Sequence, residues 1–362
     1  MKKHKKHIIL YPLSFLYGLV TGFRNWLFDQ DLLPTTSFHI PIISIGNLAV
    51  GGTGKTPHTE FILSILQHDR KIAVLSRGYK RQTKGFYLAD EKSDNSILGD
   101  EQFQIHQKFP NVAIAVDEKR VHGVQKLIEL LPNLQLVLLD DAFQHRYVEP
   151  GLSILLTDYS NLYCNDLVMP AGELREWKIG SKRAGIIIVT KCPTDLKPID
   201  MRVVESQLKI ESNQKIFFST YQYEDIVPVF PDSTPENWNF NSIKEKDVGI
   251  ILVAGIVSPE PIIEQMKQYS DNIKPIFYED HHYFQPKDFR FINKHLKNLP
   301  NSEKIILITE KDAARLVTNQ NFPEELKSKT FALPIKVSIL HNQETSFIQI
   351  IKDYVEKNTR NS

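Results

Sequence analysis

The chain has 362 residues, more than the roughly 250–300 at which a single core stops growing, so we expect two domains. Hydrophobic residues make up 41% and charged residues 24%, as in a folded soluble protein, and the net charge of +1 argues against wholesale nucleic-acid binding. Two cysteines, Cys164 and Cys192, form no disulfide framework, and no CxxC or clustered Cys/His pattern indicates structural zinc.

The N-terminus is basic and then apolar. Residues 2–7 read KKHKKH, and residues 8–23 carry no charge. This run is shorter than the ~20 apolar residues that a spanning helix needs, and Pro12 and Gly18 interrupt it. A buried helix and a cleaved signal peptide are the two alternative interpretations, although no A-x-A cleavage site follows. We favour a helix in residues 1–28 that lies on a membrane surface, where four lysines contribute roughly 4 kcal/mol against an anionic leaflet. The side chains expected to enter the acyl boundary are Phe15, Leu16, Leu19 and Phe23.

Short β-rich runs alternate with helix-like stretches through residues 29–216. Residues 56–68 and 118–131 have apolar residues at helical spacing. This alternation predicts an α/β domain in which a parallel sheet carries helices on both faces and binds ligands at the carboxyl ends of its strands. The predicted strands are residues 40–46, 71–78, 111–116, 134–141, 152–158 and 184–191.

A second block follows a stretch rich in proline and asparagine. We expect an extended linker over residues 217–242 and a smaller α/β domain over residues 243–362. The strand-like runs of this second domain are residues 248–256, 273–279 and 304–312.

Residues 47–61, NLAVGGTGKTPHTEF, predict a phosphate-binding loop between a strand and a helix. Gly54, Lys55 and Thr56 match the end of the pattern G-x-x-x-x-G-K-[ST], whereas Ala49 occupies its first glycine position. Lys55 is placed to reach the β- and γ-phosphates, and the Thr56 hydroxyl is placed to bind Mg²⁺. A plain glycine-rich turn is the alternative, but the strand–loop–helix context favours a P-loop NTPase-like domain. The predicted nucleotide-binding residues are Gly51, Gly52, Thr53, Gly54, Lys55 and Thr56.

An acidic pair ends a later apolar strand. The run LQLVLLDD delivers Asp140 and Asp141 to the carboxyl end of the sheet, where a Walker B carboxylate binds Mg²⁺. Two solvated loop acids are the alternative. The pattern leaves open which of the two aspartates binds the metal directly.

Two neighbouring classes of nucleotide-binding protein fit less well. GTPases carry N-K-x-D on a late strand, where this chain reads VTKCPTD, so we expect ATP rather than GTP. Partition-type ATPases carry an additional lysine in the loop, and Val50 stands in its place here.

Five motifs occur in order: SIGNLAVGGTGKTP, DDAFQHR, PAGELRE, DHHYF and TEKDAARL. With these motifs the chain resembles the tetraacyldisaccharide 4′-kinase family of lipid A biosynthesis, from Ser44 to about Leu316 and in its basic, apolar N-terminus. That family also has a residue other than glycine at the position of Ala49. The resemblance implies two α/β domains joined by a β-stranded linker, with ATP and Mg²⁺ as cofactors.

The resemblance also implies the reaction. The γ-phosphate of ATP is transferred to the 4′-hydroxyl of a tetraacyl disaccharide 1-phosphate, which gives lipid IVA. We therefore expect an acylated disaccharide lipid substrate and a location at the cytoplasmic face of the inner membrane, with no nucleic acid and no obligate protein partner.

The family's catalytic base is the aspartate of a G-D-E motif. The matching stretch, LGDEQF, makes Asp100 the candidate base and Glu101 its neighbour, and Gln102 stands where the family has proline. A carboxylate near the sugar hydroxyl can accept its proton as the bond to phosphorus forms. A helix N-cap is the other role that Asp100 can fill.

In the family, the first histidine of D-H-H is the dyad partner of that base. The resemblance makes His281 this partner and Asp280 the residue that orients it. A surface turn is one alternative. A metal-dependent DHH phosphoesterase is another, but its further aspartate-rich motifs are missing from the N-terminal region.

Arginines suit phosphate because their geometry allows bidentate binding. Arg77, Arg120 and Arg175 are the candidates for phosphate or substrate contacts, although each can equally form a surface ion pair. Lys311 and Asp312 of TEKDAARL are expected to support the site or to pair at a helix start.

A membrane-associated regulatory ATPase of the partition type is the alternative function. Val50 and the DHH segment favour the kinase.

Overall fold

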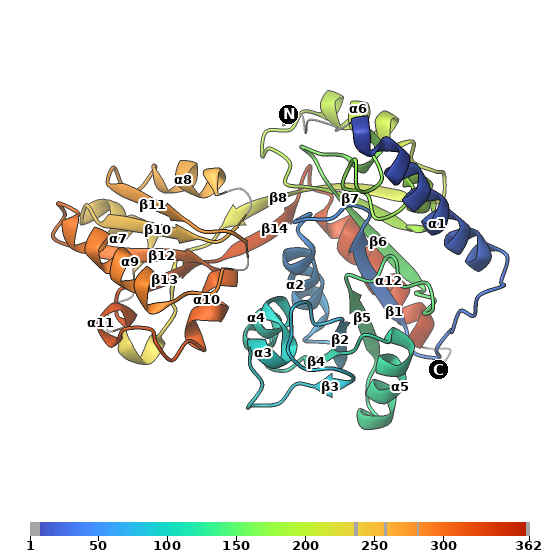
Figure 1. Cartoon of the computed structure of the whole chain (residues 1–362), viewed down its shortest axis with the longest axis horizontal. Coiled ribbons are helices and arrows are strands. Elements are labelled where there is room, and N and C mark those ends of the chain that lie inside the picture. The colour runs from blue at the N-terminus through green and yellow to red at the C-terminus, as the bar shows by residue number, and fades with distance from the viewer. Residues whose placement is uncertain (1–7, 235–237, 257–258, 281, 360–362) are drawn as a thin grey trace. The chain divides into compact units, whose positions relative to one another are not determined.

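The computed structural model describes residues 8–234, 238–256, 259–280 and 282–359. The chain divides into two compact units (Figure 1). Unit 1 comprises residues 1–93, 108–221 and 337–362, and unit 2 comprises residues 94–107 and 222–336. Residues 94–107 therefore group with the second unit, although they lie inside the range 29–216 that the sequence suggested for the first domain.

A nine-stranded sheet forms the centre of unit 1, in the order β14-β8-β7-β6-β1-β5-β2-β4-β3. The pairings from β4 through β8 are parallel, and the short β3 is antiparallel to β4. Every residue of the central strands β1, β2, β5 and β7 is buried, as expected for a parallel sheet covered on both faces. The strands are β1 (Ile42–Asn47), β2 (Ile72–Ser76), β3 (Tyr87–Leu88), β4 (Ala113–Val116), β5 (Leu136–Asp140), β6 (Leu152–Asp158), β7 (Ile186–Thr190), β8 (Lys215–Tyr223) and β14 (Ile335–Ile339).

Successive residues of β8 show how both faces of this sheet are covered. Phe218 joins a core cluster with residues of α6, whereas Phe217 packs edge-on against Phe347 of α12. Phe347 also stacks on Phe61 of α2. Because neighbouring side chains of a strand point to opposite faces, helices lie on both sides, and the predicted fold class is confirmed. The longer helices are α1 (Tyr11–Asp29), α2 (Lys55–Leu66), α5 (Arg120–Leu130), α6 (Pro198–Leu208) and α12 (Glu344–Thr359).

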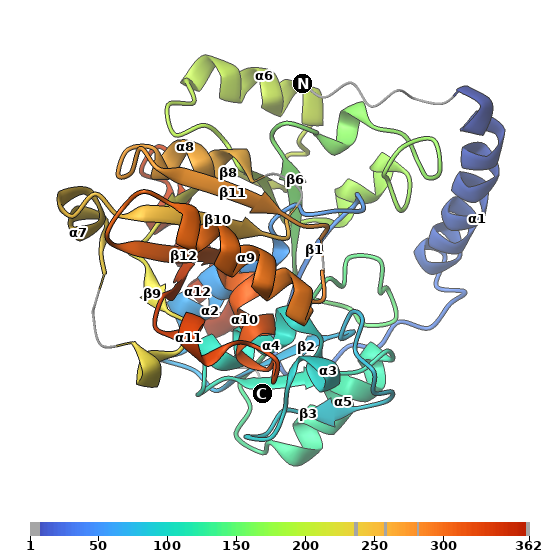
Figure 2. The same ribbon diagram turned by 60° about the vertical axis from the view of Figure 1, so that its left-hand side comes forward.

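Unit 2 is built on a five-stranded sheet in the order β11-β10-β12-β13-β9, in which only the pairing of β9 is antiparallel. Alternate residues of β10 supply its two cores. Ile251 and Val253 pack with α9, and Ile250 and Leu252 pack with α7 and α8. Figure 2 shows α9 lying across one face of this sheet. The strands are β9 (Val227–Pro228), β10 (Gly249–Ala254), β11 (Ile273–Phe277), β12 (Lys304–Thr309) and β13 (Thr330–Leu333).

The segment 94–107 contributes two short helices to unit 2, α3 and α4. The helices of unit 2 are α3 (Asn95–Leu98), α4 (Asp100–Lys108), α7 (Phe240–Glu245), α8 (Glu260–Met266), α9 (Pro286–Asn298), α10 (Glu310–Val317) and α11 (Glu324–Lys327). Short 3-10 helices span Ile8–Leu10, Tyr163–Asn165, Lys178–Arg183 and Pro231–Ser233.

The N-terminal helix α1 packs on unit 1 along a narrow seam. Its buried residues are Ser14, Gly18 and Phe28, and the Trp177 indole N–H donates to the Gly18 carbonyl at 2.6 Å. A side chain at position 18 would meet the Trp177 ring at 2.4 Å, so only glycine fits there. No helix in the described part of the chain combines the length and apolar character needed to cross a membrane. The large apolar side chains that α1 leaves exposed are Tyr11, Leu13, Phe15, Leu16, Leu19, Val20, Phe23 and Trp26.

Candidate functional site

The loop after β1 runs to Lys55, the first residue of α2, as expected for a phosphate-binding loop. Gly51 and Gly54 have φ angles of +112° and +88°, in the region that favours glycine. A Cβ atom on Gly54 would lie 2.0 Å from the Tyr221 hydroxyl oxygen. Glycine is therefore required at position 54 by both conformation and space.

The structure explains why alanine stands at the first glycine position of the motif. Ala49 forms an antiparallel bridge with Leu174. The flanking amides continue this pairing, since the Val50 N–H donates to the Glu173 carbonyl and the Arg175 N–H donates to the Leu48 carbonyl, both at 2.7 Å. Extended backbone accepts any L-residue, so glycine offers no advantage there. This bridge also joins the loop to the PAGELRE segment.

A histidine of α2 and two hydroxyls of β7 and β8 hold the loop. The ring nitrogens of buried His58 lie 2.7 Å from the Gly54 carbonyl and 2.9 Å from the Ser219 hydroxyl. The Thr190 hydroxyl donates to the Thr53 carbonyl at 2.9 Å. These contacts fix the path of the loop. The hydroxyls of Ser219 and Thr190 were not predicted from the sequence because they come from distant strands.

His58 makes unit 1 sensitive to acid. Burial lowers the pKa of His58 from 6.5 to about 4, although the Gly54 carbonyl opposes this shift. Below pH 6.5 the unfolded chain binds a proton that the folded chain refuses, so stability falls as pH falls from about 6.5 to 4, by about 3 kcal/mol for this residue. We expect His58→Gln to flatten this part of the curve of unfolding free energy against pH, measured by urea denaturation.

The exposed His68 provides the matched control, since His68→Gln should leave the slope unchanged. Burial also lowers the pKa of His145 to about 4, so part of the dependence of stability on pH should persist in both variants. Equal slopes for His58→Gln and the parent would contradict this assignment.

The two aspartates of the predicted Walker B motif differ in their surroundings. Asp140 ends β5, is buried, and accepts a hydrogen bond from the Thr59 hydroxyl of α2 at 3.1 Å. Asp141 has φ +48° and lies 3.7 Å from the Lys55 ammonium and 2.9 Å from the Arg175 guanidinium. Burial raises the pKa of Asp141, but the charges of Lys55 and Arg175 outweigh burial and hold it below its ordinary value. Two neighbouring carboxylates supply oxygen ligands of the kind that suits Mg²⁺.

Arg120 is a buried cation with incomplete hydrogen bonding. It begins α5, is 3% exposed, and donates through Nη1 to the Asp117 carbonyl. Its Nε and Nη2 atoms are buried and have no hydrogen-bond partner among the residues that the structure describes. Burial lowers its pKa to about 10, while Asp141 and Asp140 oppose this shift. A guanidinium in this state needs an additional acceptor, and a phosphate oxygen is one that matches its charge.

The structure thus brings most of the predicted phosphate-binding residues together in unit 1. Arg77, which follows β2, acts electrostatically on both Arg120 and His145. Gln144 was not predicted. Its side-chain amide donates to the Asn47 carbonyl at 2.8 Å and its side-chain oxygen accepts from Arg175 at 3.4 Å.

Helix α1 also contacts this site. The Tyr17 hydroxyl donates to the Arg175 carbonyl at 3.0 Å, and Arg24 donates to the Gln144 carbonyl at 3.1 Å. The exposed apolar helix is therefore attached to the segments that hold the acidic pair.

Asp100 belongs to unit 2. It is the first residue of α4, and its carboxylate accepts from Arg315 Nε at 2.9 Å and from the Asn95 side chain at 3.4 Å. Glu101 follows in the same turn and is half-buried. Two acids in a first turn suit the positive end of the helix dipole.

The DHH segment is described only in part. Asp280 accepts from the Lys311 ammonium at 2.9 Å. The predicted partner His281 lies outside the described residues, so its role stays a prediction. The next residue, His282, lies 3.0 Å from Asp288 and stacks on Tyr278.

The family model for tetraacyldisaccharide-1-P 4'-kinase matches residues 6–356. The chain belongs to this family. It is 48% identical to the tetraacyldisaccharide 4'-kinase of Bacteroides thetaiotaomicron, over 99% of this chain and 96% of that protein. It is 42% identical to that of Flavobacterium johnsoniae, over 96% and 98% of the two chains.

A solved structure agrees with this membership of the tetraacyldisaccharide 4'-kinase family. A crystal structure of LpxK from Aquifex aeolicus in complex with ATP superposes with a TM-score of 0.72 at 26% identity, covering 96% of this chain and 98% of that one. The predicted resemblance and the predicted kinase activity are confirmed, and nothing supports the alternative of a partition-type ATPase.

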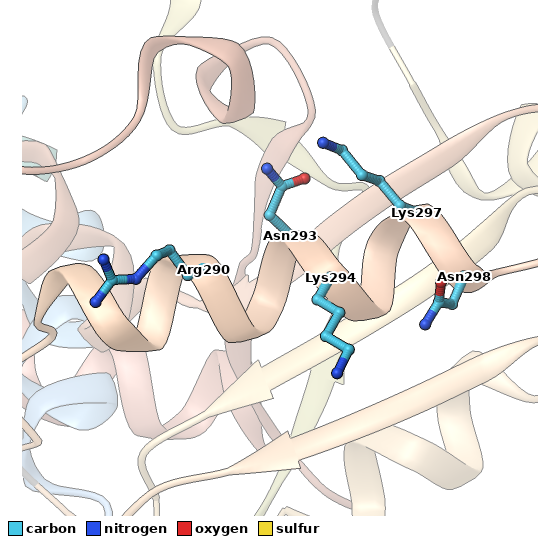
Figure 3. Close-up of a pocket in the computed structure, with 5 residues that line it drawn as sticks. All are labelled: Arg290, Asn293, Lys294, Lys297 and Asn298. Atoms are coloured by element: carbon cyan, nitrogen blue, oxygen red, sulfur yellow. The ribbon is translucent and has the colours of Figure 1, made fainter.

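One surface cavity lies apart from the motifs of the kinase family. A hollow of about 310 Å³ is lined by residues of α9 alone. Figure 3 shows these side chains diverging along one helix rather than converging on a point. We therefore do not assign the substrate to this hollow. Its lining residues are Arg290, Asn293, Lys294, Lys297 and Asn298.

Proposed function

We propose that this chain transfers the γ-phosphate of ATP to the 4′-hydroxyl of a tetraacyldisaccharide 1-phosphate and so forms lipid IVA. Membership of the kinase family supports the acceptor, and the Aquifex aeolicus LpxK complex supports ATP as the donor. The main support for phosphate binding at this site is the burial of Arg120. Two of its nitrogens are unsatisfied, and it interacts electrostatically with Asp140 and Asp141.

ATP is bound by the loop between β1 and α2. The backbone amides of Gly51, Gly52 and Gly54 are assigned to the phosphates, whereas the Thr53 amide donates to the Gly51 carbonyl at 3.0 Å. Lys55 neutralises the charge of the β- and γ-phosphates. Thr56, Asp140 and Asp141 are the residues that would hold Mg²⁺. When bound, Mg²⁺ neutralises phosphate charge and orients the γ-phosphate.

The arginines separate into two groups by their contacts. Arg175 is paired with Asp141 at 2.9 Å, so its role is to orient that carboxylate. Arg120 and Arg77 face no such direct ion pair among the described contacts, and we assign them to a phosphate of ATP or the 1-phosphate of the lipid.

Asp100 is the base in this proposal. Its carboxylate accepts the proton of the 4′-hydroxyl as the new bond between oxygen and phosphorus forms and the bond between the γ-phosphorus and ADP breaks. His281 and Asp280 are assigned to hold this carboxylate and to pass the proton on, with Glu101 beside the substrate.

Dependence on the acceptor tests the function. Purified enzyme is incubated with γ-labelled ATP and Mg²⁺, with and without tetraacyldisaccharide 1-phosphate in detergent micelles. We expect labelled lipid only when the disaccharide is present, and Lys55→Ala should abolish it. Release of inorganic phosphate at the same rate without the disaccharide would contradict the proposal.

We also propose that α1 holds the enzyme on the inner-membrane surface at its cytoplasmic face. The helix presents Phe15, Leu19 and Phe23 to solvent at 60%, 50% and 61% exposure, whereas the opposite side packs on unit 1. Insertion of this face brings a substrate that keeps four acyl chains in the bilayer to the segments that α1 contacts.

Replacing Phe15, Leu19 and Phe23 together by glutamate should release the enzyme from membranes, because three charges would then enter the acyl boundary. Vesicles of phosphatidylethanolamine and phosphatidylglycerol, sedimented with the protein, provide the measurement. The large exposed residue Ile199 of α6 gives the control, since Ile199→Glu should leave binding intact. Unchanged sedimentation of the triple variant would refute the assignment of α1.

A further inference from the structure

Helix α10 begins with a closed network around a fully buried aspartate. Asp312 is 0% exposed. Its Oδ2 accepts from the Gly255 amide at 2.9 Å and from the Thr309 hydroxyl at 2.7 Å, and the Thr309 hydroxyl accepts from the Asp312 amide. These bonds come from the end of β12 and from the residue after β10, so the Asp312 carboxylate cannot rotate without breaking two of them.

Arg315 is held by this aspartate on the same helix. Its Nη1 donates to Asp312 Oδ1 at 2.9 Å, and its side chain is 6% exposed. A guanidinium is planar, so a bond at Nη1 to a fixed carboxylate also fixes the direction in which Nε points.

That Nε donates to Asp100 Oδ2 at 2.9 Å, across 215 positions of sequence. A second link runs parallel to it, since Thr318 at the end of α10 donates to the Asn95 side-chain oxygen at 3.2 Å and the Asn95 amide reaches Asp100 Oδ1 at 3.4 Å. All of these residues belong to unit 2. Helix α10 and its C-cap residue Thr318 therefore hold both the carboxylate of Asp100 and the turn that precedes it.

We propose that Arg315 is a positioning residue for the phosphoryl transfer, which fixes the Asp100 carboxylate in the orientation that accepts the hydroxyl proton. Asp312 orients Arg315 in turn. The inference rests on the proposed role of Asp100 as base. It extends that role to a residue held between the carboxylates of Asp312 and Asp100.

Stability is a weaker explanation for this network. A buried ion pair seldom adds net stability, because removing both charges from water costs about as much as their attraction returns. Asp312 and Arg315 already pair with each other within one helix, so neither charge needs Asp100 for compensation. A positioning role explains why Arg315 also donates to Asp100.

A double-mutant cycle tests the inference on the full-length enzyme, with ATP and the disaccharide 1-phosphate in detergent micelles. Arg315→Gln should lower kcat about 10–100-fold, the range expected for losing one charge-assisted hydrogen bond, and leave the KM for ATP unchanged. In the Asp100→Asn background the same substitution should change kcat less than threefold, because the group that Arg315 orients is already gone.

Arg315→Lys keeps the charge opposite Asp312 but cannot reach both carboxylates in the fixed geometry, so it should recover only part of kcat. It also serves if Arg315→Gln fails to fold. Arg290→Gln, which removes an exposed guanidinium from α9 of the same unit, should leave kcat and KM unchanged. Thermal melting shows that each variant is folded.

Two results would overturn the inference. One is an equal loss of kcat on Arg315→Gln in the parent and in Asp100→Asn, which is what a structural role produces. The other is full activity of both Arg315→Gln and Arg315→Lys. Full activity of Asp100→Asn alone would instead remove Asp100 as the base, so failure of the proposed function can be told apart from failure of the positioning role.

Discussion

Replacing Asp100 by alanine should lower kcat by about 10²–10⁴-fold while ATP still binds, the range that loss of a general base produces. Nucleotide affinity should persist because the phosphate-binding loop and the acidic pair belong to unit 1, whereas Asp100 is carried by unit 2. Titration calorimetry with ATP and Mg²⁺ and the labelled-phosphate assay measure the two quantities separately.

The nearby exposed Glu91 provides the matched control for this substitution. Glu91→Ala removes a carboxylate from the same stretch of chain and should change neither quantity. An Asp100→Ala enzyme with normal kcat would exclude the base role. An Asp100→Ala enzyme that loses ATP binding as well would show that the residue serves the nucleotide rather than the sugar hydroxyl.

Arg120→Met should lower activity and leave the unliganded protein at least as heat-stable as the parent. The loss of two charge-assisted hydrogen bonds to phosphate predicts a fall in kcat/KM of about 10²-fold or more. The free energy of unfolding should stay the same or rise. Arg120 is buried with Nε and Nη2 unsatisfied, and methionine fills a similar volume without burying unpaired polar atoms.

Kinetics and calorimetric melting without ligand measure these two effects. Arg202→Met on the exposed face of α6 is the control, and should alter neither. A variant that melts well below the parent while keeping kcat/KM would show that Arg120 is a structural residue whose buried nitrogens are satisfied in another way.

Local chemistry explains which parts of the phosphate site were predictable from the sequence. Gly54, Lys55 and Thr56 are adjacent, and their conformational and charge requirements are met within a few residues at the start of α2. Asp140 and Asp141 follow an apolar run whose burial on both faces makes it a strand of a parallel sheet. Such signals need no knowledge of distant contacts.

The departure at Ala49 shows where a local pattern stops being informative. By the consensus pattern G-x-x-x-x-G-K-[ST], alanine at position 49 is a mismatch. The bridge to Leu174 shows that this position has extended backbone, because the PAGELRE segment pairs with the loop here. Only a contact across 125 positions of sequence could explain it.

The sequence by itself determined the strand–loop–helix of the predicted phosphate site, the acidic pair, the alternating α/β architecture and an apolar N-terminal helix, because periodicity and residue chemistry act over short distances. Tertiary structure alone decided that Ser219 and Thr190 hold His58 and the loop, that Arg120 is buried with unsatisfied nitrogens, and that α10 holds Asp100 in unit 2. Each of these depends on which distant side chains share a buried volume. Burial and pairing of that kind set both hydrogen-bond partners and proton affinities, and a linear pattern of residues does not encode them.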